Sequence, residues 1–338
     1  MSADDLLCTE ELDSWLLENV VCPLDRCSLE RDGNWLISTV NEQNRYPIAY
    51  GIPVMIPVSV NQTAWWAMES RKRAEAIANG EEDSQFYDCS DDEVHPHVRG
   101  ILESTGGHLY KAIKQTVPEY PIPGIRMSPR HESALLLDCG CNWGRWTFSA
   151  ARNGFRSVGI DPSLHAVIAA RQIRRRLKLP CTFVVGDCRY LPFSDAVFSD
   201  VFSYSVVQHF SRADAALAAN DFARVTASGG ECMLQMPNFL GIRCLFHQAK
   251  RGFREGENFD VRYYSIAELK RLFEPFTPHV SLSVDGFFGL GIQPDDRKYM
   301  QGFSRLVIDA SEFLRGVTRV FPPMIHIADS VYLHGKKI

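Results

Sequence analysis

The chain has 338 residues, of which 45% are hydrophobic and 11% aromatic, so it can bury a large core without disulfides or metals. Its net charge of −5 excludes a strong overall attraction to nucleic acid or to an anionic membrane surface. No apolar run reaches the length of about 18 residues that a membrane span needs. Because the acidic N-terminal sequence also lacks the pattern of a secretory signal, we expect a cytoplasmic protein.

The cysteines are scattered, and several lie inside hydrophobic runs, which favours buried thiols over a disulfide framework. Two of them flank Gly140 as a C-x-C pair and raise the question of a metal or redox site. A single such pair with no second pair nearby is a poor metal site, so we expect no metal ion. The ten cysteines are Cys8, Cys22, Cys27, Cys89, Cys139, Cys141, Cys181, Cys188, Cys232 and Cys244.

The first part of the chain divides into two regions that differ in sequence pattern. In residues 1–60, short apolar or alternating runs are broken by Gly, Pro and Asn, which predicts a small β-rich domain. Residues 61–130 predict a helical connector or cap. It begins with a helix near residues 63–80, passes through an acidic loop at 81–93 and ends in a Pro-rich segment.

The rest of the chain, residues 131–338, alternates strand-like apolar runs with helical patterns. This alternation predicts an α/β fold, with a mostly parallel sheet and helices on both faces. We interpret the segments near 238–264 and 286–325 as insertions, and the second could form a lid or a dimer surface. The strand candidates are residues 134–139, 156–161, 181–187, 198–205 and 230–237, with a final strand near 328–337.

Three successive strand candidates each end in an aspartate, at Asp138, Asp161 and Asp187. The turn after the first of these strands contains Gly140 and Gly144, which would let a ligand approach backbone N–H groups. A carboxylate before that turn would repel the pyrophosphate of a dinucleotide and attract an ammonium group. One such aspartate is commonly just a helix cap, but three in phase favour a ligand site.

Four stretches carry a family resemblance: LLLDCGCNWGRW, VGIDPS, VVGDCRYLPFSDAVFSDVFSYSVVQHF and GGECMLQMPN. Together they resemble the class I S-adenosylmethionine-dependent methyltransferases, in the group that includes ubiquinone and menaquinone biosynthesis enzymes. The resemblance covers residues 100–338, most of the chain. It implies a Rossmann-like fold with a seven-stranded sheet, S-adenosylmethionine as the cofactor and methyl transfer as the reaction.

The resemblance also implies which residues surround the cofactor. Around its methionine part these are Asp138, Gly140, Cys141, Asn142 and Gly144; at its ribose they are Asp161 and Pro162; at its adenine they are Asp187 and Cys188; and on the path to its methyl group they are Ser203 and Tyr204.

One of these residues departs from the family, because Asn142 stands where the family usually has glycine. Asparagine is the residue other than glycine that best tolerates left-handed backbone angles. We therefore expect the turn to form. The Asn142 amide would either contact the cofactor or brace the loop.

The N-terminal unit resembles a zinc-ribbon-like domain that activates methyltransferases of tRNA, rRNA and release factors. The metal-binding form of that domain has two C-x-x-C pairs. Here Asp25 takes the second place of the first pair, Cys27 follows two residues later, and residues 36–46 contain no cysteine. We therefore predict no zinc, and we expect this unit to pack on the catalytic domain or on a partner.

Methyl transfer from a sulfonium depends mainly on placing the nucleophile in line, and it needs a base only for a hydroxyl or a protonated amine. The candidate base is His209, which could instead order its loop or touch the cofactor carboxylate; His247 is the second candidate. The segment around His247 is a candidate wall for an anionic substrate, or else an ordinary solvated loop. The wall residues are Arg243, Arg251, Arg254, Arg262, Tyr263 and Tyr264.

Three functions follow from these patterns. We favour an enzyme that methylates an O or N atom of a small molecule or biosynthetic intermediate, with a homodimer left open. The second is a methyltransferase of tRNA, rRNA or a translation protein, suggested by the N-terminal resemblance and the arginine-rich residues 171–178. The third is a non-catalytic cofactor-binding scaffold, suggested by Asn142 alone.

Overall fold

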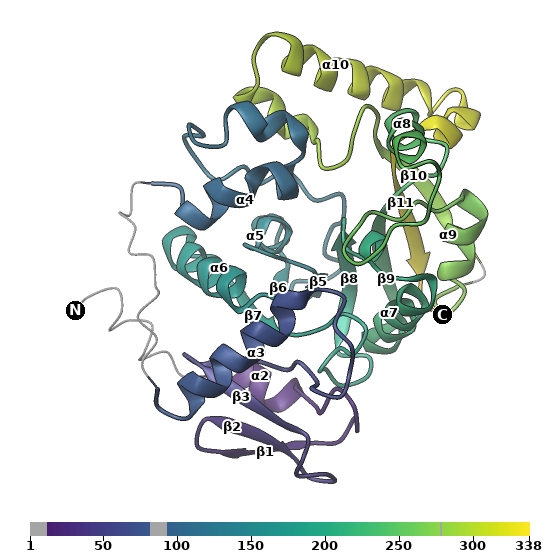
Figure 1. Ribbon diagram of the computed structural model, residues 1–338. Coiled ribbons are helices and arrows are strands. Elements are labelled where there is room, and N and C mark those ends of the chain that lie inside the picture. The colour runs from purple at the N-terminus through teal and green to yellow at the C-terminus, as the bar shows by residue number, and fades with distance from the viewer. Residues whose placement is uncertain (1–11, 82–92, 278) are drawn as a thin grey trace.

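The computed structural model describes residues 12–81, 93–277 and 279–338, and its main feature is a seven-stranded sheet (Figure 1). The strand order is β10-β11-β9-β8-β5-β6-β7. All neighbouring pairs from β9 to β7 are parallel, whereas β11 runs antiparallel to both β9 and β10. The strands are β5 (Leu135–Cys139), β6 (Arg156–Asp161), β7 (Cys181–Val185), β8 (Phe198–Tyr204), β9 (Thr226–Pro237), β10 (Ser281–Gly286) and β11 (Ser330–Lys336). This confirms the predicted fold class.

Helices cover both faces of this sheet. Figure 1 shows α5 (Arg145–Arg152) and α6 (Leu164–Leu177) on one face, and α7 (Arg212–Val225) and α9 (Ile266–Leu272) on the other. The remaining helices are α2 (Ser14–Asn19), α3 (Trp65–Ala78), α4 (Pro96–Gly106), α8 (Ile242–Lys250) and α10 (Gly302–Val317), with the 3₁₀ helices η1 (His108–Ala112), η2 (Val207–His209), η3 (Pro294–Tyr299) and η4 (Pro322–Ile327).

The central strand β5 shows why the sheet is covered on both sides. All five of its residues are buried. Leu135 and Leu137 pack in the cluster that contains Phe222 of α7, and Leu136 packs in the cluster that contains Trp146 of α5. Successive side chains of a strand point to opposite faces, so a strand buried on both faces is a continuous apolar run.

A separate four-stranded antiparallel sheet precedes the large one. Its strands, in the order β1-β2-β3-β4, are β1 (Leu29–Asp32), β2 (Trp35–Ser38), β3 (Arg45–Ala49) and β4 (Ile52–Pro53). The chain then passes directly to the edge of the large sheet, where Val54 bridges Val185 of β7 and the Met55 N–H donates to the Val185 carbonyl at 2.7 Å. The small sheet is thus joined by backbone hydrogen bonds to the large sheet.

A hydrogen-bonded cluster surrounds Asp25 in this small unit. The Asp25 carboxylate accepts from Asn44 at 2.7 Å, from Ser38 at 2.8 Å and from the Cys22 thiol at 3.4 Å. The bonds from Asn44 and Ser38 lower the pKa of Asp25. In residues 12–81, 93–277 and 279–338 no group of three or more His, Cys, Asp or Glu side chains is arranged to hold a metal ion. The absence of zinc remains a prediction.

Some sequence predictions lie outside the described residues, namely Cys8, Cys89 and nearly all of the acidic loop at 81–93. The eight cysteines within the described ranges are free thiols, and all but Cys27 are buried. Among the helices of those same ranges, none combines the length and the apolar character that crossing a membrane requires.

A side-chain contact also fastens the small unit to the large sheet, and it can be tested. Arg26 donates to the Leu191 carbonyl at 2.9 Å and to the Asp221 carboxylate at 2.8 Å. We expect Arg26→Met to lower the free energy of unfolding by about 1 kcal/mol, because Arg224 still pairs with Asp221 in the variant. Urea denaturation measures this change.

The matched control is Arg31→Met, since exposed Arg31 donates to Gly33 of its own hairpin and to no other residue of the described ranges. Its effect should stay within about 0.5 kcal/mol. Equal losses in the two variants would contradict the assigned docking role of Arg26.

Candidate functional site

A cavity of about 810 Å³ lies at the carboxyl ends of the parallel strands. Its walls include the loops that follow β5, β6, β7 and β8, together with residues of α3, α4, α8 and two later loops. Ligands of open α/β sheets bind at this edge, because strand ends, loops and helix N-termini converge there. Of the residues expected around a ligand, Gly140, Cys141, Asn142, Asp161, Pro162, Asp187, Cys188, Tyr204, His209 and His247 line the cavity.

The first wall is the loop from β5 to α5. Gly140 adopts a φ of 78°, and a Cβ atom there would collide with the side chain of Val206, which follows β8. The Gly140 and Cys141 N–H groups donate to the Ile160 carbonyl at 2.8 and 3.0 Å. Glycine at this place therefore lets the ends of β5, β6 and β8 approach closely.

Asn142 braces this loop through its backbone. Its φ is 46°, in the left-handed region, and its N–H donates to Asp161 Oδ2 at 3.0 Å. The Asn142 side chain lies against that of His97 from α4, and the pKa of His97 is lowered to about 4, chiefly by burial. Asn142 Oδ1 and His97 Nε2 are buried and form no hydrogen bond of good geometry with any described group.

Asp161 presents a partly free carboxylate at the end of β6. Its Oδ2 accepts from Asn142 and its Oδ1 from the Ser163 N–H at 2.9 Å, so each oxygen keeps further acceptor capacity. The residue is 7% exposed and lines the cavity. Burial raises its pKa to about 6, against the lowering effect of the two backbone bonds. Asp161 can thus accept hydrogen bonds from hydroxyl groups of a ligand.

Asp187, at the next strand end, is more fully engaged than the sequence indicated. The Arg189 guanidinium donates to both of its carboxylate oxygens, at distances from 2.6 to 3.1 Å. Arg189 also pairs with Asp214 at 2.9 Å and donates to the Asn61 carbonyl at 2.7 Å. The negative charge of Asp187 is therefore balanced inside the protein, while its neighbour Cys188 lines the cavity.

Three expected site residues lie beneath the cavity wall rather than on it, namely Asp138, Gly144 and Ser203. Asp138 is 1% exposed and accepts from the Thr147 hydroxyl at 2.7 Å, and burial raises its pKa to about 7. Ser203 donates to the Cys139 carbonyl at 2.9 Å. The structure gives these side chains contacts that support the loop instead of contacts across the cavity.

His209 lines the cavity from η2. Its Nδ1 lies 2.7 Å from the Phe259 carbonyl, and its ring stacks on the Phe259 ring with centroids 3.9 Å apart. A carbonyl can only accept, so Nδ1 carries the hydrogen, and Nε2 is the acceptor of a long hydrogen bond from the Gln208 amide at 3.4 Å. Burial lowers the pKa of His209. The imidazole is therefore neutral near pH 7 and also holds the segment around Phe259 in place.

The candidate anionic wall divides into two groups. Arg243 and Tyr263 line the cavity together with His247. Arg262 instead donates to the His209 carbonyl at 2.6 Å, Arg251 to the Val261 carbonyl at 3.0 Å, and Tyr264 to the Phe210 carbonyl at 3.4 Å. Arg254 is exposed and does not line the cavity. The prediction of a wall is wrong for these four residues, because three of them hold the backbone of their own region together.

Several lining residues were missed by sequence reasoning. Most come from the connector and from a glycine-rich loop, both of which the sequence left without site residues, whereas Gln208 and Phe259 come from the segments after β8 and α8. The histidines in that connector were the available signal, but nothing local says that they face the cofactor strands. The missed residues include Trp66, His97, Thr105, His108, Gln208, Phe259, Gly289 and Gly291.

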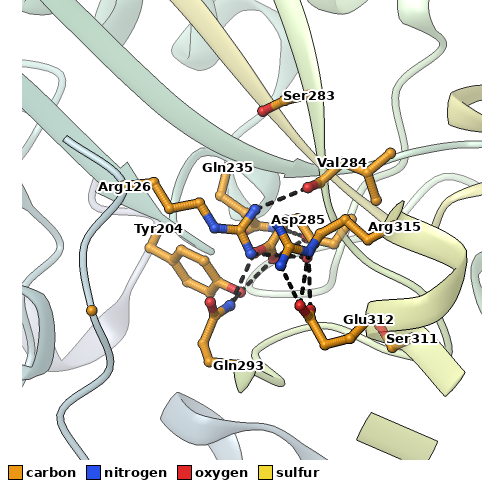
Figure 2. A network of polar contacts seen from close by, with 12 residues as sticks. Arg126, Tyr204, Gln235, Ser283, Val284, Asp285, Gln293, Ser311, Glu312 and Arg315 are labelled. Atoms are coloured by element: carbon orange, nitrogen blue, oxygen red, sulfur yellow. Dashed lines mark hydrogen bonds and ion pairs between the residues drawn. The ribbon is translucent and has the colours of Figure 1, made fainter. Parts of the chain in front are cut away.

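A buried polar network supports the end of β8 (Figure 2). Asp285, which is 2% exposed, accepts from Tyr204 at 2.6 Å and from Gln293 at 2.9 Å. Ser330 donates to Asp285 at 2.6 Å and in turn accepts from Gln235, which also binds the backbone after Tyr204. The Tyr204 ring lines the cavity while its hydroxyl points to Asp285, and burial raises its pKa. Its hydroxyl therefore stays protonated and bonded to Asp285.

A second buried network joins the start of α5 to the connector and to η3. Arg145, the first residue of α5, is 2% exposed and pairs with Asp296 of η3 at 2.8 Å. The same guanidinium donates to the carbonyls of Pro121 at 2.9 Å and Thr105 at 3.0 Å. Tyr110 donates to Asp296 at 2.7 Å. One ion pair thus ties the connector and the second insertion to the loop that follows β5.

This ion pair predicts a large energetic effect. Arg145→Met leaves Asp296 as a buried charge without its partner, so we expect a loss of about 3–5 kcal/mol in the free energy of unfolding. Replacing both partners, as Arg145→Met with Asp296→Leu, should cost clearly less than the sum of the single changes. Urea denaturation of the three variants measures the coupling. Additive losses would show that the pair does not act as a unit.

Comparison with known proteins agrees with this geometry. Residues 136–230 match the model of a family described as a methyltransferase domain. A malonyl-[acyl-carrier protein] O-methyltransferase of Serratia marcescens is 32% identical over 108 residues, which are 31% of this chain and 39% of that protein. The match therefore spans about two fifths of the relative's length.

Two solved structures show distant likeness. Phosphoethanolamine N-methyltransferase 2 of Haemonchus contortus, in complex with S-adenosylmethionine, has 15% identity and a TM-score of 0.44, over 71% of this chain and 56% of that chain. The YcgJ protein of Bacillus subtilis has 16% identity and a TM-score of 0.42, over 72% of this chain and 100% of that chain. Likeness at this level carries no argument about substrates.

The described residues fit S-adenosylmethionine, the cofactor that the resemblance of the sequence implies. Glycine at 140 keeps the strand ends in close packing, and an added Cβ would break that arrangement. Asp161 offers acceptor capacity at the strand end where ribose hydroxyls are expected, while the charge of Asp187 is already balanced by Arg189. Residues 136–230 thus match a methyltransferase domain, and the cavity extends well beyond the strands that these residues contribute.

Proposed function

We propose that the chain is an S-adenosylmethionine-dependent methyltransferase that acts on a small molecule or biosynthetic intermediate. One observation carries this proposal: a single cavity is shared between the cofactor loops and segments outside the matched domain. Those segments contribute Glu103, Ser104, Thr105, Gly107, His108, Arg243, Cys244, His247, Phe259, Val261, Tyr263, Gly289, Leu290 and Gly291. A cavity walled by a connector and two insertions suits a ligand that is enclosed rather than a large surface.

The residues of this chain supply positioning and, for some acceptors, a base. When bound, the cofactor would supply a methyl group on a sulfonium. The leaving group is then a neutral thioether, which needs no acid. Val206 and Tyr204 shape the wall after β8, and Tyr204 is held by Asp285. His209 Nε2 can take a proton from a hydroxyl or ammonium acceptor, because Nδ1 is committed to the Phe259 carbonyl.

The alternative of an RNA substrate loses one of its two supports. The arginine-rich helix α6 was the candidate phosphate-binding surface. In the structure Arg171 donates to the Tyr50 carbonyl at 2.5 Å, Arg174 to the Cys181 carbonyl at 3.1 Å, and Arg176 to the Tyr120 hydroxyl at 3.3 Å. These guanidinium groups fasten α6 to its neighbours, so the small-molecule proposal is favoured.

Calorimetry with S-adenosylhomocysteine tests the proposed function directly. We expect the protein to bind it, and Asp161→Ala to weaken binding by about 1.5–3 kcal/mol, because two ribose hydroxyls lose their charged acceptor. The control is Asp32→Ala, an exposed aspartate of β1 outside the cavity, which should bind like the wild type. If the wild-type protein binds neither this compound nor S-adenosylmethionine, the proposal is wrong and a scaffold role gains.

The same binding should depend on pH. Burial raises the pKa of Asp161 to about 6, and hydroxyl donors favour its ionised form. Affinity should therefore be constant well above pH 6 and should fall by up to about tenfold per pH unit below it. Calorimetry between about pH 5 and pH 8 gives the profile.

Asp161→Asn is the control for this profile, because an amide does not titrate. Its weaker binding should lose the midpoint near the Asp161 pKa. A midpoint that persists in Asp161→Asn would assign the titration to another group, such as Asp138 with its pKa of about 7.

A further inference from the structure

A cationic and imidazole cluster lies at the cavity wall formed by α8 and η1. Arg243 Nη1 donates to His108 Nε2 at 2.7 Å and to the Phe288 carbonyl at 3.3 Å. Arg243, His108 and His247 all line the cavity. No carboxylate of residues 12–81, 93–277 or 279–338 lies within ion-pair distance of the Arg243 guanidinium.

The two histidines add hydrogen-bonding groups without balancing this charge. Burial and then Arg243 lower the pKa of both imidazoles. The positive charge of Arg243 thus repels the protonated form of each imidazole. Lys250 lowers the pKa of His247 further. His108 is held in place from the other side, since a Cβ on Gly289 would lie 2.9 Å from its ring. The cluster is oriented before any ligand arrives.

The acidic groups nearest to this cluster are already engaged. Asp329 Oδ1 accepts from the backbone N–H groups of Arg243 and Cys244 at 2.6 and 3.0 Å, and Oδ2 accepts from the Phe288 N–H at 2.7 Å. Asp329 therefore caps α8 from within the core. Glu103 also lines the cavity and pairs with Lys114 at 3.5 Å. Neither carboxylate forms an ion pair with the Arg243 side chain.

We infer that the cluster of Arg243, His108 and His247 binds an anionic group, a carboxylate or a phosphate, on the molecule that is methylated. The inference rests on the proposed function, which places cofactor and acceptor in one cavity. A guanidinium offers several N–H donors in a plane that matches both kinds of anion, and a cavity wall strengthens the attraction relative to open solvent. The anion supplies the negative charge that the described residues do not provide.

Anion titrations of the complex with S-adenosylhomocysteine test this inference. The probes are inorganic phosphate and malonate, and uncharged malonamide is the comparison. Calorimetry measures the binding of each compound. We expect at least one anion to bind, malonamide not to bind, and Arg243→Met to weaken the anion by about tenfold or more. The better probe of the two identifies the phosphate or the carboxylate as the preferred group.

Two further variants complete the test. Arg243→Lys keeps the charge and should retain part of the affinity, while Arg254→Met removes an exposed arginine outside the cavity and should change nothing. The inference is overturned if neither anion binds, or if both bind Arg243→Met as tightly as the wild type.

The proposed function is tested separately. The binding of S-adenosylhomocysteine to each variant is measured before the anion is added. Unchanged binding to Arg243→Met also shows that this variant is folded. Should the wild type not bind S-adenosylhomocysteine, the anions are titrated into the protein alone, and the same dependence on Arg243 decides the inference.

Discussion

The buried ion pair of Arg145 and Asp296 is the constraint on which the cavity depends. Arg145 follows directly after the cofactor loop, while Asp296 lies in η3, and carbonyls of the connector accept the remaining donors of the guanidinium. The Arg145 side chain is 2% exposed, so its charge is stable there only when all of these hydrogen-bond partners are present. This ion pair therefore favours one arrangement of the connector, the second insertion and the Rossmann-like sheet.

The same constraint explains why the glycine-rich loop at 289–291 lies where it does. Arg145 also donates to the Gly291 carbonyl at 3.4 Å, and a Cβ on Gly291 would lie 2.9 Å from the Gly107 nitrogen. The connector and this loop touch backbone to backbone, and both of them line the cavity. Close packing of that kind fixes His108 and, through it, Arg243. The positions of His108 and Arg243 thus depend on the packing around Arg145.

The sequence predicted the sheet and the cofactor strands because their signals are local. Five strand candidates and the final strand near 328–337 correspond to strands of the structure, and the three aspartates fall at strand ends as expected. The edge strand β10 was not predicted, although residues 280–285 alternate apolar and polar side chains over one short run. The acceptor side was predicted only in part, because Arg243 and His108 are 135 residues apart and meet only through tertiary packing. Nor could sequence show that Arg189 neutralises Asp187.

His209 shows how one residue can join the two sides of the cavity. Its Nδ1–H holds the Phe259 carbonyl, and the Phe259 ring lies against both His209 and Trp66 of α3, with centroids 3.9 and 4.7 Å away. The two roles considered for His209 therefore share one cause: the hydrogen bond that orders the segment also fixes the tautomer that leaves Nε2 as an acceptor. An anionic acceptor atom would need only the first role, whereas a hydroxyl or an ammonium group would need both. The chemical nature of the acceptor atom decides how much of this arrangement the reaction uses.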